Sequence, residues 1–431
     1  MPFSTYSIQI DHPDDSDQVI LFSTRTAAAV TLHRDVIRDI EAGRLSSDER
    51  ETLSELGIIV PDRKGEREEM RSYINDMNVA IKSLTVTLVM SLDCNLACPY
   101  CFEGTRKGKY YLSEETADDF LRFIGNRLPG LDKLFIRFYG GEPLLSFDMI
   151  HRIAAELARA ASEARVNFSF GFVTNGTLLT RRVVEKLKPL GLQSAYVTLD
   201  GPGEMHDMSR PFRNGSGSFK TIINNLQSIA GLLELHLGGN YLRTNYRAFP
   251  RLLDFLIAQQ LGPDAVSLMS FSPIMNEDAK FCPDYHDGCS NDNEPWVAEA
   301  GLYLRREILA RGYRTDEVLP TVCMMERHDF LVINWDGVLY KCPCLIGRKD
   351  VGAGTLKSGM ADYRETHDLG NWKNEECLSC RYLPLCFGGC RHTKLIREGT
   401  MKGIECKKEY FDKTLETLVL QDMEYNKAPE T

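Results

Sequence analysis

The chain has 431 residues, of which 43% are hydrophobic and 26% are charged, a balance typical of a globular protein and not of a fibrous or disordered one. Its formal net charge of -10 makes nucleic acid or an anionic membrane surface an unlikely partner. No apolar stretch approaches the roughly 18 residues that a bilayer span needs, and residues 1–18 lack the regions of a signal peptide, so we expect a cytoplasmic protein. Thirteen cysteines, an odd number, cannot form a closed disulfide framework, and a reducing compartment leaves thiols for metal binding or catalysis.

Residues 1–80 are expected to form a small domain of short strands followed by helices. Residues 6–10 and 19–22 have the pattern of strands, and Leu32, Val36 and Ile40 have the spacing of a helix face. Such a domain is too small for a catalytic core and suits a binding module.

Local signals place the later elements of this first domain. Ser46 and Glu49 fit a capping box at a helix start, and Gly57 is placed to end that helix. Residues 58–60 are expected to form a short strand, and residues 70–77 lie on another helix.

From residue 84 an apolar strand, a turn and an amphipathic helix alternate. The expected strands are 84–90, 134–139, 168–174, 195–199, 233–240 and 265–271, and the expected helices between them are 114–128, 149–161, 181–187, 219–229 and 249–259. Six such units predict an α/β fold with a parallel sheet curled into a partial (βα)6 TIM-like barrel, whose chemistry lies at the carboxyl ends of the strands. A bridging helix at 296–310 and a cysteine-rich segment follow.

The first cysteine cluster comes directly after the first barrel strand. Cys94, Cys98 and Cys101 lie in one short loop, and soft thiolate ligands select zinc or iron-sulfur clusters. Three thiolates leave a fourth metal position open to a substrate or cofactor. A zinc knuckle completed by a distant residue is the structural alternative.

The spacing CxxxCxxC with Tyr100 before the last cysteine resembles the hallmark of radical S-adenosylmethionine (SAM) enzymes. The resemblance implies that Cys94, Cys98 and Cys101 hold a 4Fe-4S cluster whose unique iron binds SAM. It also implies an enzyme, in the oxidoreductase and peptide-modifying range, that uses a 5′-deoxyadenosyl radical and an external one-electron donor of flavodoxin or ferredoxin type.

The resemblance continues at the ends of the next strands, and it implies further SAM-binding residues. Each motif alone would be an ordinary turn, but they follow in order. Gly140, Gly141 and Glu142 match the family's GGEP motif, and glycine permits close approach to the ligand. An arginine such as Arg210 can bind the SAM carboxylate through two hydrogen bonds. The other implied contacts are Thr174, Asn175, Thr198 and Asp200.

A second cysteine cluster occupies residues 323–406. By composition alone it predicts two tetrahedral sites, of zinc or iron-sulfur. Its spacing resembles the SPASM domain, an iron-sulfur domain that follows many radical SAM barrels and carries two auxiliary 4Fe-4S clusters. The family pattern assigns Cys377, Cys380, Cys386 and Cys406 to auxiliary cluster II, and Cys323, Cys342 and Cys390 to auxiliary cluster I.

Auxiliary cluster I lacks a fourth ligand near Cys323. It either has an open iron or recruits Cys344, Cys282 or Cys289, and the last two are equally well explained as thiols without a role. With this resemblance we expect four parts: a winged-helix-like leader-recognition domain at 1–80, the radical SAM barrel at 84–312, the SPASM domain at 313–412 and a tail at 413–431.

SPASM enzymes mostly modify peptides and proteins, and many begin with a domain that binds the leader of a precursor peptide as an added strand. Sulfatase-maturing relatives carry an Asp base directly after the cysteine that corresponds to Cys342, where this chain has Pro343. The departure favours a maturase that crosslinks a ribosomally made peptide, by joining cysteine sulfur to carbon as a thioether. The alternatives are a sulfatase-type protein oxidase, a small-molecule radical SAM dehydrogenase and a noncatalytic zinc-binding adaptor.

Overall fold

The structure is a computed structural model that describes residues 1–101, 103, 106–274 and 294–425. It divides into two compact units, one made of Met1–Ile81, Glu317–His328 and Arg364–Thr431, the other of Lys82–Asp316 and Asp329–Tyr363. The predicted thiols Cys282 and Cys289 lie outside the described residues. Among the described helices, none is both long enough and apolar enough to cross a membrane.

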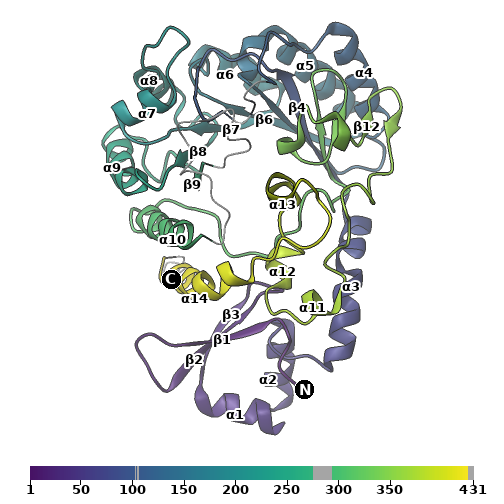
Figure 1. The fold of residues 1–431 in the computed structure, drawn as a ribbon, viewed down its shortest axis with the longest axis vertical. Helices are drawn as coiled ribbons and strands as arrows, with labels where there is room; N and C mark the ends of the chain where they lie inside the picture. Colours follow the sequence, from purple (N-terminus) through teal and green to yellow (C-terminus); the bar gives the residue numbers. More distant parts are fainter. Residues whose placement is uncertain (102, 104–105, 275–293, 426–431) are drawn as a thin grey trace. The chain divides into compact units, whose positions relative to one another are not determined.

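The second unit is built on one sheet with the strand order β11-β10-β4-β5-β6-β7-β8-β9. Strands β4 to β9 are all parallel, lie side by side in chain order, and curve as a partial barrel (Figure 1). Their bounds are β4 Ser83–Ser91, β5 Lys133–Gly140, β6 Asn167–Thr174, β7 Leu192–Thr198, β8 Glu234–Tyr241 and β9 Leu268–Pro273. The predicted α/β fold with a partial (βα)6 barrel is confirmed.

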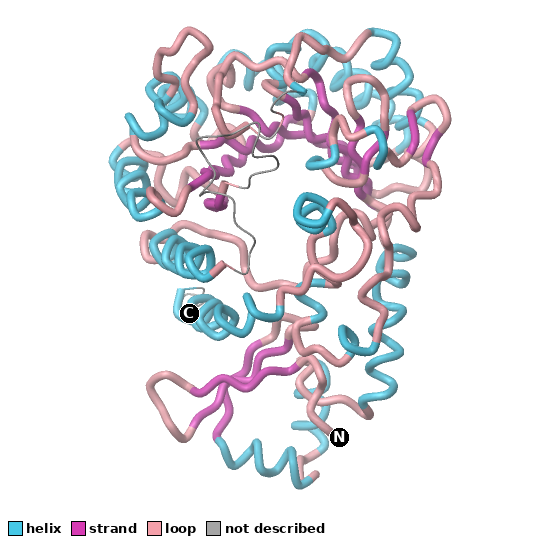
Figure 2. The backbone as a smooth tube through the Cα atoms, in the orientation of Figure 1, coloured by secondary structure: helices cyan, strands magenta, loops and turns pink. Residues whose placement is uncertain are grey.

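Helices cover the outer face of this sheet (Figure 2). They are α4 Glu114–Gly125, α5 Phe147–Ala164, α6 Arg181–Leu187, α7 Gly203–Ser209, α8 Phe219–Ile229, α9 Phe249–Ala258 and α10 Pro295–Leu309. Short 3-10 helices lie at η2 Pro143–Ser146, η3 Lys188–Leu190, η4 Tyr246–Ala248, η6 Pro343–Leu345 and η7 Lys349–Val351. The apolar faces of the α-helices and the side chains of the strands form one buried core. In this core the rings of Phe138 and Phe170 meet edge to face, with their centroids 5.4 Å apart.

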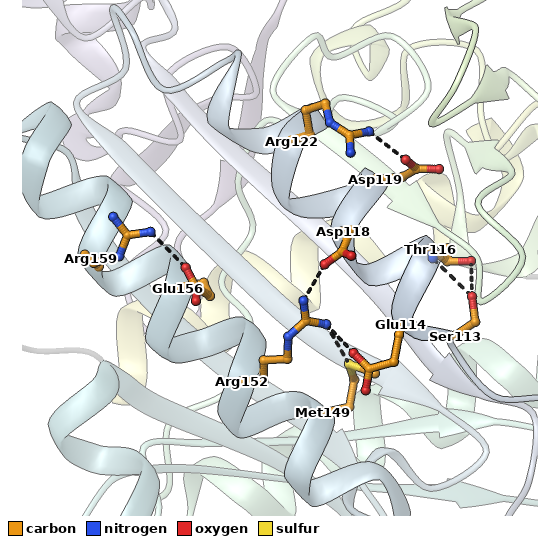
Figure 3. Close-up of polar contacts among 10 residues, drawn as sticks. All are labelled: Ser113, Glu114, Thr116, Asp118, Asp119, Arg122, Met149, Arg152, Glu156 and Arg159. Carbon is orange, nitrogen blue, oxygen red and sulfur yellow. Dashed lines mark hydrogen bonds and ion pairs between the residues drawn. The ribbon is translucent and has the colours of Figure 1, made fainter.

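Polar contacts link the outer surfaces of α4 and α5 (Figure 3). Arg152 of α5 pairs with Glu114 and Asp118 of α4, and these exposed pairs contribute little to stability individually. Figure 3 shows their side chains on the solvent side of both helices, which leaves the barrel interior to the site.

The cysteine-rich segment adds strands to the barrel unit that the sequence pattern did not predict. Strand β10 (Phe330–Ile333) pairs parallel with β4, and β11 (Leu339–Tyr340) pairs antiparallel with β10. The small hairpin of β12 (Gly354–Thr355) and β13 (Gly359–Met360) follows. These strands are too short to show an alternation of apolar and polar residues.

The first unit contains an antiparallel sheet of β1 (Ser7–Asp11), β2 (Gln18–Ser23) and β3 (Ala29–His33). Its N-terminal helices are α1 (Arg34–Ala42), α2 (Ser47–Glu55) and α3 (Arg63–Ala80). The predicted capping box of Ser46 and Glu49 is present at the start of α2.

Two local expectations in this unit were wrong. Leu32 pairs with Val19 in the sheet instead of lying on a helix, because His33 caps α1 one residue later. Residues 58–60 form no strand; Ile59 makes a single bridge to Phe3. In both places the run of apolar residues is too short to distinguish one kind of secondary structure from another. Tertiary contacts determine which conformation forms.

The N-terminal sheet and helices pack directly on the C-terminal cysteine segment within this unit. That segment contributes α11 (Glu375–Leu378), α12 (Leu383–Cys386), α13 (Arg391–Glu398) and α14 (Lys408–Tyr425). One buried cluster joins Ile8 and Phe22 to Leu385 and Leu415, and Figure 1 shows α14 beside the small sheet. A second buried cluster contains Tyr6, Met70, Ile74, Trp372, Leu378, Leu383 and Phe387.

Candidate active site

The three cysteines of the first cluster lie in the loop that follows β4. Cys94 is buried, and its sulfur accepts hydrogen bonds from the backbone of Leu96 at 3.4 Å and from Nδ2 of Asn175 at 3.7 Å. A turn in which the Cys101 amide donates to the Cys98 carbonyl at 3.3 Å brings the last two cysteines together. The loop thereby gathers its thiols at the carboxyl end of the first barrel strand.

The electrostatics of this loop suit an anionic group with thiolate ligands. Burial raises the pKa of the Cys94 thiol to about 11 and also raises that of Cys98. Lys107 hydrogen-bonds Cys101 and interacts with all three thiols, which raise its pKa although burial opposes this. Thiolates at this site therefore need a metal to compensate their charge, and Lys107 supplies a further cation. Within the described part of the chain, no three Cys, His, Asp or Glu side chains are close enough to hold one metal ion.

Glu142 lies at the end of β5, where two glycines let the chain pass close to β4. A Cβ atom at Gly140, whose φ is 142°, would lie 2.2 Å from the Ser91 carbonyl oxygen, and one at Gly141 would lie 2.2 Å from that of Asp93. Only glycine fits these two positions without moving the backbone. The glycine pair therefore sets how Glu142 enters the site.

The Glu142 carboxylate is fully buried and joins the ends of β5 and β6. It accepts hydrogen bonds from Thr174 Oγ1 at 2.8 and 2.9 Å, from the Asn175 amide at 2.8 Å and from the Leu144 amide at 3.0 Å. Burial raises the pKa of this carboxyl, and the hydrogen bonds oppose the rise. The predicted residues Gly140, Gly141, Glu142, Thr174 and Asn175 thus meet at one place.

Three further predicted SAM contacts, Tyr100, Asp200 and Arg210, meet beyond the end of β7. Tyr100 hydrogen-bonds Asp200, and Nη1 of Arg210 donates to the Tyr100 hydroxyl at 2.7 Å and lies 3.6 Å from Asp200. Arg210 keeps a buried Nε that has no hydrogen-bond partner within the described residues. That nitrogen is available to a ligand carboxylate. Thr198 ends β7, but its side chain makes no hydrogen bond in the part of the chain that is described.

Several polar residues of this site were not predicted from the sequence. The backbone amide of Asn240 donates to Asp200 Oδ1 at 2.7 Å, and Nδ2 of Asn95 donates to Thr177 Oγ1 at 2.8 Å. Asp93 accepts from the Cys94 amide at 3.0 Å and from Tyr111 and Arg213. Asn240 carried a usable signal, since it is a polar residue at the end of an expected strand.

The four thiols that the family pattern assigns to auxiliary cluster II all belong to the first unit. Burial raises the pKa of Cys386 to about 12, and Cys380, Cys377 and Cys406 also act on it. Helices α11 and α12 and the turns between them keep all but the last thiol close in sequence, and Cys377 also packs against the buried cluster that contains Tyr6.

The predicted thiols of auxiliary cluster I occur in both units. Cys323 and Cys390 interact with one another in the first unit. Cys342 and Cys344 belong to the barrel unit. Burial raises the pKa of the Tyr139 hydroxyl at the end of β5, and both cysteines, together with Cys101, raise it further. Pro343 begins η6 between Cys342 and Cys344.

Residues 88–256, which include this first cysteine loop and the ends of five strands, match the family model of the Radical SAM superfamily. This part of the chain is a radical SAM domain. Two relatives are similar to it: the radical SAM cyclopropyl synthase TigE of Paramaledivibacter caminithermalis (28% identity, covering 40% of this chain and 39% of TigE) and the serine-type anaerobic sulfatase-maturating enzyme of Bacteroides thetaiotaomicron (23%, 70% and 81%).

Two solved structures resemble more of the chain than the family model covers. anSMEcpe with bound AdoMet and the Cp18Cys peptide has a TM-score of 0.62 and 17% identity, covering 79% of this chain and 99% of that one. Streptococcus suis SuiB bound to the precursor peptide SuiA has a TM-score of 0.53 and 16% identity, covering 94% and 98%. At these identities the likeness establishes the fold.

A radical SAM domain implies a 4Fe-4S cluster and SAM, and the residues present fit both groups. The match of residues 88–256 supports an enzyme that uses a 5′-deoxyadenosyl radical. Cys94, Cys98 and Cys101 would hold the cluster, while the unpartnered Nε of Arg210 and the Glu142 region would bind SAM. The cluster and SAM together supply a carbon-centred radical that removes a substrate hydrogen, and the protein supplies their positions.

Proposed function

We propose that this enzyme is a maturase that installs crosslinks, as cysteine sulfur-to-carbon thioethers, in a ribosomally made precursor peptide. It would act in the cytoplasm with three 4Fe-4S clusters, SAM and an external one-electron donor of flavodoxin or ferredoxin type. The observation that carries the proposal is the architecture: an N-terminal sheet and a C-terminal cysteine segment accompany the barrel, and the structural match with SuiB covers 94% of this chain.

In this proposal, residues 1–80 bind the leader of the precursor. Strand β3 lies at one edge of the three-stranded sheet, and an extended peptide can add there as a further strand. Backbone hydrogen bonds would supply affinity, and the neighbouring side chains would supply specificity. The peptides bound by SuiB and anSMEcpe make a peptide the favoured class of substrate.

Pro343 directs the proposal away from sulfatase maturation, although a sulfatase-maturating enzyme is among the relatives. Proline has no group that can accept a proton, so the residue after Cys342 cannot serve as a base. In a thioether-forming reaction a substrate thiolate would instead lie near a metal, and thiolate is a suitable ligand for an open iron at Cys342. The radical would take a hydrogen atom from carbon, the thiol would lose its proton, and a cluster would accept one further electron. Together these steps remove the two electrons that the new carbon-sulfur bond requires.

The test is incubation of the reduced enzyme with SAM and a cysteine-containing precursor peptide encoded beside its gene. Each thioether should make the product lighter by about 2 Da and remove one alkylatable thiol. A disulfide gives the same loss of mass, so alkylation must follow reduction. A product that regains every thiol on reduction, or a carbon-carbon link with cysteines untouched, contradicts the thioether.

Two other classes remain as outcomes of the same preparation. A small-molecule dehydrogenase would oxidise a free metabolite and ignore the peptide. A zinc-binding adaptor would contain zinc and no sulfide after anaerobic purification, which iron, sulfide and zinc analysis distinguishes.

A further inference from the structure

A buried cation lies beside two cysteines of the first unit. Arg391 follows Cys390 directly and begins α13, yet only 1% of its side chain is exposed. An arginine keeps its charge in the interior, so burial is costly unless anions and hydrogen-bond acceptors surround it. The contacts of Arg391 therefore indicate what its charge is for.

One edge of the Arg391 guanidinium is held by protein oxygens. Nη2 pairs with the buried carboxylate of Glu326 and donates to the Asp368 carbonyl at 3.0 Å, and Nε donates to the same carbonyl at 3.3 Å. Glu326 is held in turn by the Gly370 amide at 2.8 Å. These contacts fix the plane of the guanidinium.

Among the described residues, the other edge of the guanidinium keeps an unused hydrogen-bond donor. Nη1 of Arg391 is buried and has no oxygen or nitrogen partner within the described residues. Burial raises the pKa of the Cys323 thiol, the charge of Arg391 opposes this rise, and Cys390 adds to it. Backbone geometry agrees, because the Glu326 amide donates to the Cys323 carbonyl at 2.9 Å. A single ion pair thus adjoins both cysteines.

We propose that Arg391 is a positioning and tuning residue for the cluster at Cys323 and Cys390, to whose sulfur it donates a hydrogen bond and whose reduction its charge favours. The inference rests on the proposed function, which assigns an iron-sulfur cluster to these thiols. Adding an electron makes such a cluster more negative, and a fixed cation in a dry site stabilises the reduced state more than the oxidised one. Glu326 holds the cation in place and partly offsets its charge.

The experiment is a potentiometric titration of the full chain, followed by electron paramagnetic resonance. Cys94, Cys98 and Cys101 are all changed to Ala in every sample, so that only the auxiliary clusters titrate. Arg391→Gln should move the midpoint potential of one cluster to a more negative value and leave the other in place. Arg391→Lys, which keeps the charge, should stay near the parent, and Glu326→Gln should move the same midpoint to a more positive value.

Equal midpoints in the parent, Arg391→Gln and Arg391→Lys, with iron content retained, would overturn the inference and leave the proposed function intact. An equal fall in Gln and Lys variants would also overturn it, because packing and not charge would be responsible. If the Arg391→Gln variant loses iron, the Glu326→Gln variant becomes the deciding measurement. An unchanged midpoint potential in the Glu326→Gln variant would then overturn the inference. Unchanged iron content in Cys323→Ala would show that no cluster forms there, a failure of the proposed function itself.

Discussion

The hydroxyl group of Tyr6 donates a hydrogen bond of 2.9 Å to the carbonyl oxygen of Leu378, although 372 positions separate the two residues. Tyr6 is fully buried, and burial raises the pKa of its hydroxyl well above the usual range. Leu378 lies between Cys377 and Cys380 in the chain. The N-terminal domain is therefore part of the core that supports these cysteines.

Removing this hydrogen bond should weaken the first unit. Tyr6→Phe leaves the Leu378 carbonyl without its buried partner, so we expect a loss of about 1 kcal/mol in the free energy of unfolding. Chemical unfolding of the anaerobic protein measures the loss, with Tyr110→Phe at an exposed position as the control. Equal stability of the Tyr6→Phe variant and the parent would contradict the expectation.

Deleting residues 1–80 should disturb the cysteine segment of the first unit. It would expose Trp372, Leu383 and Phe387, which now pack against Tyr6, Met70 and Ile74, and so loosen the segment that carries the later cysteines. Iron analysis should find less iron in the truncated protein, and a dye for apolar surface should bind it more strongly. Full iron content in a monomeric truncated protein would rule this out.

Changing Cys94, Cys98 and Cys101 together to Ala should remove about four irons and abolish SAM cleavage, since these thiols would hold one cluster. Iron analysis and detection of 5′-deoxyadenosine after chemical reduction check both effects. Changing Cys344 alone in the same way is the comparison, and it should retain SAM cleavage. Formation of 5′-deoxyadenosine by the triple variant would refute the assignment of this loop.

Glu142→Gln should lower both stability and SAM affinity. The buried carboxylate accepts from two backbone amides and Thr174, and a Gln side chain would turn an N–H group toward some of these donors. We expect a loss of about 2 to 3 kcal/mol in stability, and SAM binding weaker by at least about tenfold. Calorimetry and equilibrium dialysis measure them, with the exposed Glu156→Gln as the control. Unchanged SAM affinity would exclude Glu142 from the binding site.

His206 should make the barrel less stable in acid. Its Nδ1 accepts from the Asp200 amide at 3.2 Å, and its Nε2 lies 3.0 Å from the Ser218 hydroxyl, which donates to the Arg210 carbonyl at 2.6 Å. These partners require the neutral ring with hydrogen on Nε2, because a proton on Nδ1 would face the Asp200 N–H. Burial, aided by Arg210, lowers the pKa of His206 to about 3.

The sign of the pH effect follows from this lowered pKa. Below about pH 6.5 the unfolded chain takes up a proton at His206 and the folded chain does not, so stability present above pH 6.5 is lost as the pH falls toward about 3. Thermal melting between pH 7.5 and 5.5 should fall less steeply in His206→Asn, which keeps an acceptor for Asp200, than in the parent. The control His328→Asn, at an exposed position, should follow the parent, and equal slopes in all three would disprove the prediction.

The sequence by itself determined the features that depend on neighbours in the chain. The barrel strands were predicted because each is a continuous apolar run flanked by turns, and β4 to β9 lie close to the expected ranges. The cysteine spacing located the first loop, and the match to the GGEP motif located the Gly140-Gly141 pair, because both signals lie within a few neighbouring residues. The capping box at Ser46 is of the same local kind.

Only the tertiary structure decided which distant groups meet. Tyr100 lies after β4, whereas Asp200 and Arg210 both lie after β7, and their contact depends on the order of strands in the curved sheet. Strand β10 forms by pairing with β4, and Leu32 joins a strand by pairing with β2. A short apolar run does not predict either pairing, so neither strand could be assigned from the sequence. The packing of residues 1–81 on the later cysteines, and the pairing of Arg391 with Glu326, had no signal in the sequence, because hydrophobic burial and charge compensation depend on distance in space and not on separation along the chain.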